Sequence, residues 1–149
     1  MPATPKVYGL FLESLVEGRI NVRSDPMMIM LVTATYVFNQ NTHKFKSAVV
    51  GEISSASGYV AGGKQVTGLN PIYTGVTRLL TLPAGNINWP SVTFSNVIGG
   101  VIYMAPAGLG DALKPLVGYI DFGGPVSRAS QAFYVNWPAT GVAKLGPVT

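Results

Sequence analysis

The chain has 149 residues, of which 48% are hydrophobic and only 11% charged, with a net charge of +4. This length suits one domain, and the composition excludes both intrinsic disorder and long exposed helices, which need many charged residues. The basic residues are spread along the chain instead of gathering with aromatic residues in one stretch, which argues against direct binding of nucleic acid. A weak preference for an acidic partner surface fits the charge equally well. We therefore expect one domain over residues 1–149.

Two simple absences in the sequence narrow its chemistry and location. The chain has no cysteine, which excludes disulfides, thiolate metal sites and thiol nucleophiles. No apolar run approaches the roughly 20 residues that a membrane helix needs, and the first residues lack the charged start and apolar core of a signal peptide. We expect a soluble protein without membrane contact.

Glycine and proline, with 18 and 11 residues, separate many short apolar segments, a pattern typical of an all-β sandwich or barrel. The exception lies near the N-terminus, where apolar residues between Val7 and Val16 recur at spacings of three and four before Gly18. This periodicity predicts an amphipathic helix of about three turns. A helix this short needs a sheet to pack against, so we expect it to plug or cover the sandwich.

The expected strands follow the apolar segments. Residues 19–22 are expected to form a short strand, and residues 27–33, which lack polar alternation, a strand buried on both faces. Residues 42–48 are expected to form a short helix and residues 54–63 a loop. The remaining strands are expected at 65–69, 74–82, 92–95, 99–104, 113–122 and 131–137, which with the first two makes about eight, and residues 143–145 are expected to pair briefly at the end.

No set of residues indicates catalysis. The single histidine, His43, has no motif that joins it to Ser47 or Asp25 as a triad. The six acidic residues form neither a calcium loop nor an obvious pair, and Gly-Gly-Lys at 62–64 lacks the spacing of a phosphate loop. We predict no enzymatic activity, no cofactor and no metal, and keep a hydrolase with an unseen carboxylate pair as a minor alternative.

The candidate contact residues are aromatic side chains and methionines. Asn-Trp-Pro occurs at 88–90 and again at 136–138, and each tryptophan either closes an end of the sandwich or presents a flat ring to a sugar or a partner. The methionines of the 27–33 strand fill the core more often than they form a binding surface. Both interpretations stay open for the candidate interface, which comprises Tyr59, Trp89, Trp137, Met28 and Met30.

A chain with few charges, many small and apolar residues and no catalytic set suits a protein that partners largely cover, because obligate interfaces resemble a domain core cut in half. Both ends contain proline and look extended. We expect residues 1–6 and 141–149 to be arms that lie across a neighbouring subunit.

Several short strand and turn motifs occur in an order that resembles small virion structural proteins of tailed bacteriophages, among them capsid cement (decoration) proteins. The resemblance covers most of the chain and departs at residues 27–30 and 105–111, which would mark this protein's own contact surface if exposed. The motifs are EGRIN (17–21), DP (25–26), Tyr36 before NQNTHKF (39–45), GKQV (63–66), VTFS (92–95), GVIY (100–103), VGYIDFGG (117–124), FYVNWP (133–138) and GV (141–142).

The resemblance implies a jelly-roll-like antiparallel β-sandwich with a short N-terminal helix. It also implies a homodimer or homotrimer on the outer capsid surface that clamps adjacent subunits of the major capsid protein, with no catalytic residues to carry over. Two alternatives remain. One is a tail, neck or head-fibre base component, and the other is a carbohydrate-binding module that uses Tyr59, Trp89 and Trp137.

Overall fold

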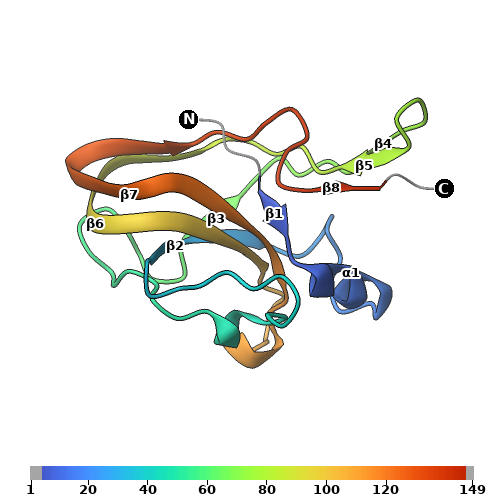
Figure 1. The fold of residues 1–149 in the computed structure, drawn as a ribbon, viewed down its shortest axis with the longest axis horizontal. Coiled ribbons are helices and arrows are strands. Elements are labelled where there is room, and N and C mark those ends of the chain that lie inside the picture. The colour runs from blue at the N-terminus through green and yellow to red at the C-terminus, as the bar shows by residue number, and fades with distance from the viewer. Residues whose placement is uncertain (1–4, 147–149) are drawn as a thin grey trace.

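The computed structural model describes residues 5–146, which form two antiparallel sheets and one short α-helix (Figure 1). The larger sheet has the strand order β1-β7-β6-β2-β3, and the smaller has the order β4-β5-β8. The helix is α1 (Gly9–Val16), and two 3₁₀ helices span Lys46–Ala48 and Asp111–Leu113. The strands are β1 (Lys6–Val7), β2 (Met27–Thr33), β3 (Lys64–Val66), β4 (Ile72–Thr74), β5 (Leu79–Thr81), β6 (Ile87–Met104), β7 (Leu116–Val135) and β8 (Lys144–Leu145).

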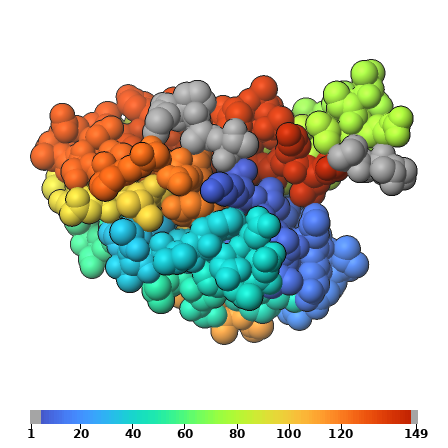
Figure 2. All heavy atoms as spheres, viewed as in Figure 1, coloured from blue at the N-terminus to red at the C-terminus, as the bar shows by residue number. Residues whose placement is uncertain are grey.

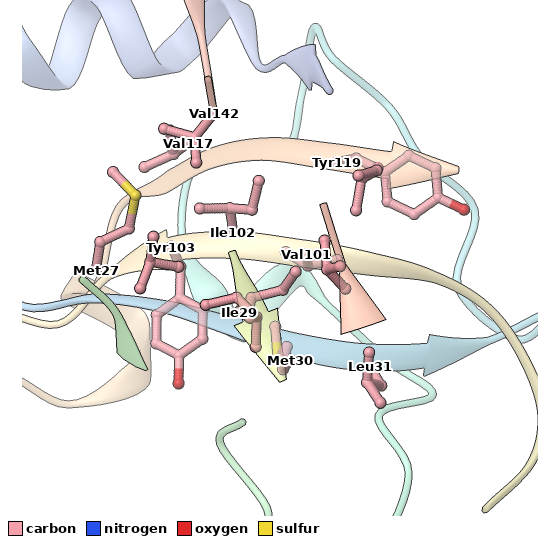
Figure 3. Close-up of a cluster of buried hydrophobic side chains, with 14 of the residues drawn as sticks. Met27, Ile29, Met30, Leu31, Val101, Ile102, Tyr103, Val117, Tyr119 and Val142 are labelled. Carbon is pink, nitrogen blue, oxygen red and sulfur yellow. The ribbon is translucent and has the colours of Figure 1, made fainter. Parts of the chain in front are cut away.

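The core lies around the β2, β6 and β7 strands of the larger sheet. The ladder places Ile29 opposite Ile102, and Ile102 in turn opposite Gly118. The prediction that the 27–33 segment is buried on both faces is confirmed for most of its length. Figure 3 shows Val142, from the C-terminal part of the chain, beside Val117 of β7 and over this sheet. The apolar run of β2 is therefore covered from both sides.

The predicted N-terminal helix is present as α1, but it is shorter than expected, with 8 residues, because Val7 lies in β1. Its Phe11 is completely buried, and the backbone just before the helix is tied to β7 by a bond of 3.1 Å from the Tyr8 N–H to the Val117 carbonyl. The helix ends at Val16, and Gly18 just after it has a φ of +71°, in the left-handed region that favours glycine. The helix packs against β7 of the larger sheet, in line with the expectation that it needs a sheet to pack against.

Several expected strand boundaries are wrong. The segments 92–95 and 99–104 belong to one continuous strand, β6, and most of the segments 113–122 and 131–137 belongs to β7, which begins at Leu116 and ends at Val135. The expected breaks are β-bulges instead: the ladder shifts its register at Asn96, which adopts positive φ, and again where Gly123 and Gly124 lie between the pairs Val97–Val126 and Gly99–Asp121. The segment 74–82 is not one strand, because a turn at 75–78 folds it into the β4–β5 hairpin. Residues 19–22 form no strand, and only Lys46–Ala48 of the expected 42–48 helix is helical.

The expected terminal arms take a different form where the structure describes them. Lys6 lies in β1 and pairs with Tyr119 of β7. Residues 141–143 are buried, so this part of the C-terminal segment belongs to the core, while the short pairing expected at 143–145 is confirmed as β8. The rest of both arms, residues 1–4 and 147–149, lies outside the described residues.

Candidate interaction surface

The aromatic side chains and methionines predicted as contact residues lie mostly in the core. Tyr59, Trp89, Trp137 and Met30 are buried within the chain, and Met28 is half-buried against the core. They therefore form no exposed contact surface, because neighbouring strands and loops of the same chain already cover them. The core interpretation of the methionines is the one that the structure supports.

Tyr59 holds the 52–63 loop against β2. Its hydroxyl donates to Glu52 Oε1 at 2.8 Å and accepts a bond of 3.1 Å from the Leu31 N–H. Glu52 Oε1 also accepts the Gly62 N–H at 2.5 Å. Burial, followed by the nearby Glu52 carboxylate, raises the pKa of Tyr59 far above its usual range, so the hydroxyl stays protonated and continues to donate. The ring has a structural role.

The two tryptophans close the far end of the long β6–β7 ribbon. The Trp89 ring lies between those of Tyr59 and Phe133, with centroid distances of 6.3 Å and 5.9 Å. Trp137 Nε1 donates to the Gly85 carbonyl at 2.8 Å, which ties the segment just after β7 to the segment just before β6. Both rings are packed within the chain and offer no open platform for a sugar.

The polar residues considered for catalysis are not assembled. His43 Nδ1 lies 2.9 Å from the Tyr36 hydroxyl, which in turn lies 2.5 Å from the Tyr8 hydroxyl. Asp25 instead accepts the Asn21 N–H at 2.7 Å, and among residues 5–146 neither Asp25 nor Ser47 bonds to His43. Within the same range, no group of three or more His, Cys, Asp or Glu side chains could hold a metal ion, and no helix is long and apolar enough to cross a membrane.

A small hollow lies on the outer part of β7. It has a volume of about 190 Å³ and is lined by Phe122, Phe133 and Tyr134 together with Arg128. The guanidinium lies 5.3 Å from the Phe133 ring centroid, and its Nε donates to the Ala132 carbonyl at 3.2 Å. The side chain is folded back against its own strand, where two of its five N–H donors bond to backbone carbonyls, those of Ala132 and Ser127.

A group of exposed apolar residues, close together in the sequence, lies on the smaller sheet. We call this element the projecting sheet and define it as residues 72–81 with residues 144–145. Figure 2 shows its hairpin as a lobe that stands away from the body of the molecule. All seven residues from 72 to 78 are exposed, including Ile72 at 42%, Tyr73 at 55% and Val76 at 94%.

The strand register places apolar side chains in a row across the projecting sheet. Tyr73 of β4 pairs with Leu80 of β5, and Leu80 pairs with Leu145 of β8. Directly opposite residues share one face of a sheet, so these three side chains lie on the same side. A single exposed apolar residue is ordinary, whereas a continuous group on a protruding element is typical of a contact surface.

The base of the projecting sheet is fixed to the body. The Leu82 N–H donates to the Ala143 carbonyl at 3.0 Å, and the Val142 N–H donates to the Leu82 carbonyl at 2.9 Å. Gly141 makes this approach possible, because a Cβ atom there would lie 1.9 Å from the Leu82 carbonyl oxygen. We call the backbone contacts of Leu82 with residues 141–143 the clamp. It positions the exposed hairpin on a buried support.

The charges of the chain divide unevenly between its body and the projecting sheet. Lys44 of the body bonds both Glu13 and Glu17, with 2.7 Å to the latter, and the Lys44 bond is the main cause that lowers the pKa of Glu17 to about 2. Asp111 pairs with Lys46 at 3.0 Å, and this hydrogen bond lowers the pKa of Asp111. The projecting sheet has two cations, Arg78 and Lys144, and no acidic residue.

The sequence of residues 72–81 contains an indication of this exposed surface, which is missed when residues 74–82 are interpreted as one strand. The 72–81 stretch has no acidic residue, and its centre contains a glycine that allows a turn.

Comparison of the chain with models of known protein families, with curated proteins and with solved structures found no match in any of the three.

Proposed function

We propose that this chain is a non-enzymatic structural protein of a tailed-bacteriophage virion. In this proposal it is a cement (decoration) protein that binds the outer surface of the head and stabilises contacts between major capsid subunits. The observation that supports it best is the projecting sheet, a clamped hairpin with a group of exposed apolar side chains. Its partners are the major capsid protein and further copies of the chain, as a homodimer or homotrimer.

The physical logic of such a protein is additive. Each copy bridges neighbouring shell subunits, and many copies act on one closed lattice, so modest affinity per copy becomes large stability of the whole shell. A β scaffold with a projecting contact element suits this role because the contact geometry is held by the core instead of being ordered on binding. The observed feature is a pair of antiparallel sheets, and the jelly-roll arrangement that the family resemblance implies stays a prediction.

Two alternatives predict different behaviour. A tail, neck or head-fibre base component would bind its own assembly and leave isolated heads unbound. A carbohydrate-binding module would hold a glycan as an isolated protein. For the second alternative, Trp89 and Trp137 are buried, and the hollow beside Phe133 and Arg128 is a candidate site because aromatic rings line it.

Co-sedimentation tests the proposal directly. The purified protein is mixed with expanded, undecorated phage heads and, separately, with unexpanded precursor heads. Saturable binding to expanded heads alone is the expected result, because expansion creates the mature subunit boundaries that a cement protein bridges. Absence of binding to both would contradict the cement function, and a glycan array would then test the carbohydrate-binding alternative.

A further inference from the structure

We infer that the projecting sheet docks into an acidic, apolar-lined groove of the major capsid protein, and that it does not join two copies of this chain. The inference rests on the proposed function and adds the chemistry of the contact: apolar burial gives the affinity, and the two cations select the partner. The shape of the projecting sheet, its charge and the pairing of the chain's own acidic residues each support this contact.

The shape of the projecting sheet suits insertion. Val76 lies in the turn at 75–78 and is 94% exposed, and Ile72 and Tyr73 precede it on the outer strand β4. β4 pairs with β5 alone among the described strands, so its second edge also carries free backbone donors and acceptors. A protruding apolar tip with an open strand edge fits a groove better than a flat surface.

The charge of the projecting sheet is entirely positive. Arg78 lies in the turn and Lys144 on β8, and both side chains are exposed. Within the part of the chain that the structure describes, neither side chain forms an ion pair, a side-chain hydrogen bond or a contact over an aromatic ring. Lys64 and Arg128, by contrast, lie over the rings of Trp89 and Phe133. The two free cations therefore favour a partner that supplies carboxylates.

A second copy of this chain is a poor source of those carboxylates. All six of its acidic side chains already accept hydrogen bonds within the chain, and two projecting sheets in contact would bring like charges together. The acids and their donors are Glu13 and Glu17 with Lys44, Asp25 with the Asn21 N–H, Glu52 with Tyr59 and the Gly62 N–H, Asp111 with Lys46 and Lys114, and Asp121 with the Gly123 N–H. Lysines pair with three of the six, Glu13, Glu17 and Asp111, which leaves few carboxylates for a second copy to offer, and we infer that the acidic partner is a different protein.

Matched substitutions test the charge. Arg78→Glu is compared with Arg23→Glu, since both arginines are exposed, neither has an ion-pair partner in the described structure, and both changes alter the net charge equally. We measure the affinity for expanded heads at about 50, 150 and 400 mM salt. We expect wild-type binding to weaken with salt, and Arg78→Glu to lose at least about tenfold at low salt and most of the salt dependence. Arg23→Glu should bind as wild type.

A second pair of substitutions tests the apolar tip. Val76→Ser is compared with Val16→Ser on α1, where the wild-type valine is 89% exposed. Burial of one valine side chain corresponds to about a tenfold change in affinity, so Val76→Ser should weaken binding by roughly that factor while Val16→Ser leaves it unchanged. All four sites are exposed, so all four variants should unfold at the wild-type temperature.

Each result bears on a definite claim. If the wild-type protein binds heads and Arg78→Glu and Val76→Ser weaken this binding no more than their control variants do, the inference is overturned. The cement function would remain intact. Sedimentation velocity adds a second criterion, because an oligomer that dissociates in Arg78→Glu or Val76→Ser would show that the projecting sheet joins copies of this chain, which also overturns the inference. Absence of wild-type binding to any head would overturn the proposed function and the inference with it.

Discussion

The clamp predicts a strong effect of a single methyl group. In Gly141→Ala the new Cβ would lie 1.9 Å from the Leu82 carbonyl oxygen, far inside the closest normal approach, and the backbone at 141 has a φ of +74°. The left-handed conformation alone costs an alanine about 1 kcal/mol relative to glycine. Relief of the clash requires Leu82 and residues 141–143 to separate by more than their hydrogen bonds allow.

The loss of the clamp adds to this cost. The two backbone bonds between Leu82 and residues 142–143 contribute about 1 kcal/mol each, and both Leu82 and Val142 are buried, so water does not readily replace them. We therefore expect Gly141→Ala to lower the free energy of unfolding by about 3 kcal/mol in urea titrations. Hydrogen exchange at the Leu82 and Val142 amides should accelerate more than exchange in β2.

Two other glycines separate the contributions to this cost. Gly108 has a φ of +80°, and a Cβ atom added there would have no other atom within 4 Å, so Gly108→Ala should cost only the conformational contribution, about 1 kcal/mol. Gly75 has neither a positive φ nor a close neighbour, and Gly75→Ala should change stability by less than about 0.5 kcal/mol. If Gly141→Ala is no worse than Gly108→Ala, the close approach to Leu82 does not hold the C-terminal segment.

Three further predictions concern polar groups. Ser14 is fully buried with no hydrogen-bond partner for its Oγ among the described residues, so Ser14→Ala should raise the free energy of unfolding by about 1 kcal/mol in urea titrations. Tyr59→Phe should lower it by about 2 kcal/mol, because the Glu52 carboxylate loses a buried donor. The pKa of Glu17 falls from its ordinary 4.5 to about 2. Its bond to Lys44 therefore stabilises the fold above about pH 4.5, and this stabilisation is lost as the pH drops toward 2. The melting temperature of Lys44→Met should therefore depend less on acid pH than that of the wild type.

The elements that the sequence predicts well are those whose pattern is local. The apolar spacing before Gly18 gives α1, and the unbroken apolar run at 27–33 gives β2, because each pattern reflects burial along one element. Sequence reasoning divides β7 because Gly123-Gly124-Pro125 is typical of a turn, and it divides β6 beside Asn96, which adopts a positive φ without being glycine, a conformation that side-chain type does not specify. Bulges of this kind depend on pairing with a partner strand.

The candidate surface is harder to predict because exposure is a tertiary property. Tryptophan is a residue type common in contact surfaces, so the sequence alone does not show that Trp89 and Trp137 are internal. The structure shows it, because Phe133 packs against Trp89 and the Gly85 carbonyl accepts the Trp137 Nε1–H. The 74–82 segment has the opposite problem. Its alternating apolar residues resemble a core strand, and only the hairpin with β4 shows that Val76 lies at an exposed tip.

The projecting sheet combines a buried base with an exposed tip, and this separates stability from binding along one short stretch of chain. Changes at the clamp, as in Gly141→Ala, act on buried backbone and should impair folding and docking together. Arg78 and Val76 are both exposed, so changes there should impair docking alone. A protein whose hairpin served only to cover its own core would not leave seven consecutive residues exposed at the tip of a clamped element. We therefore propose that the clamp holds that tip in place for a partner.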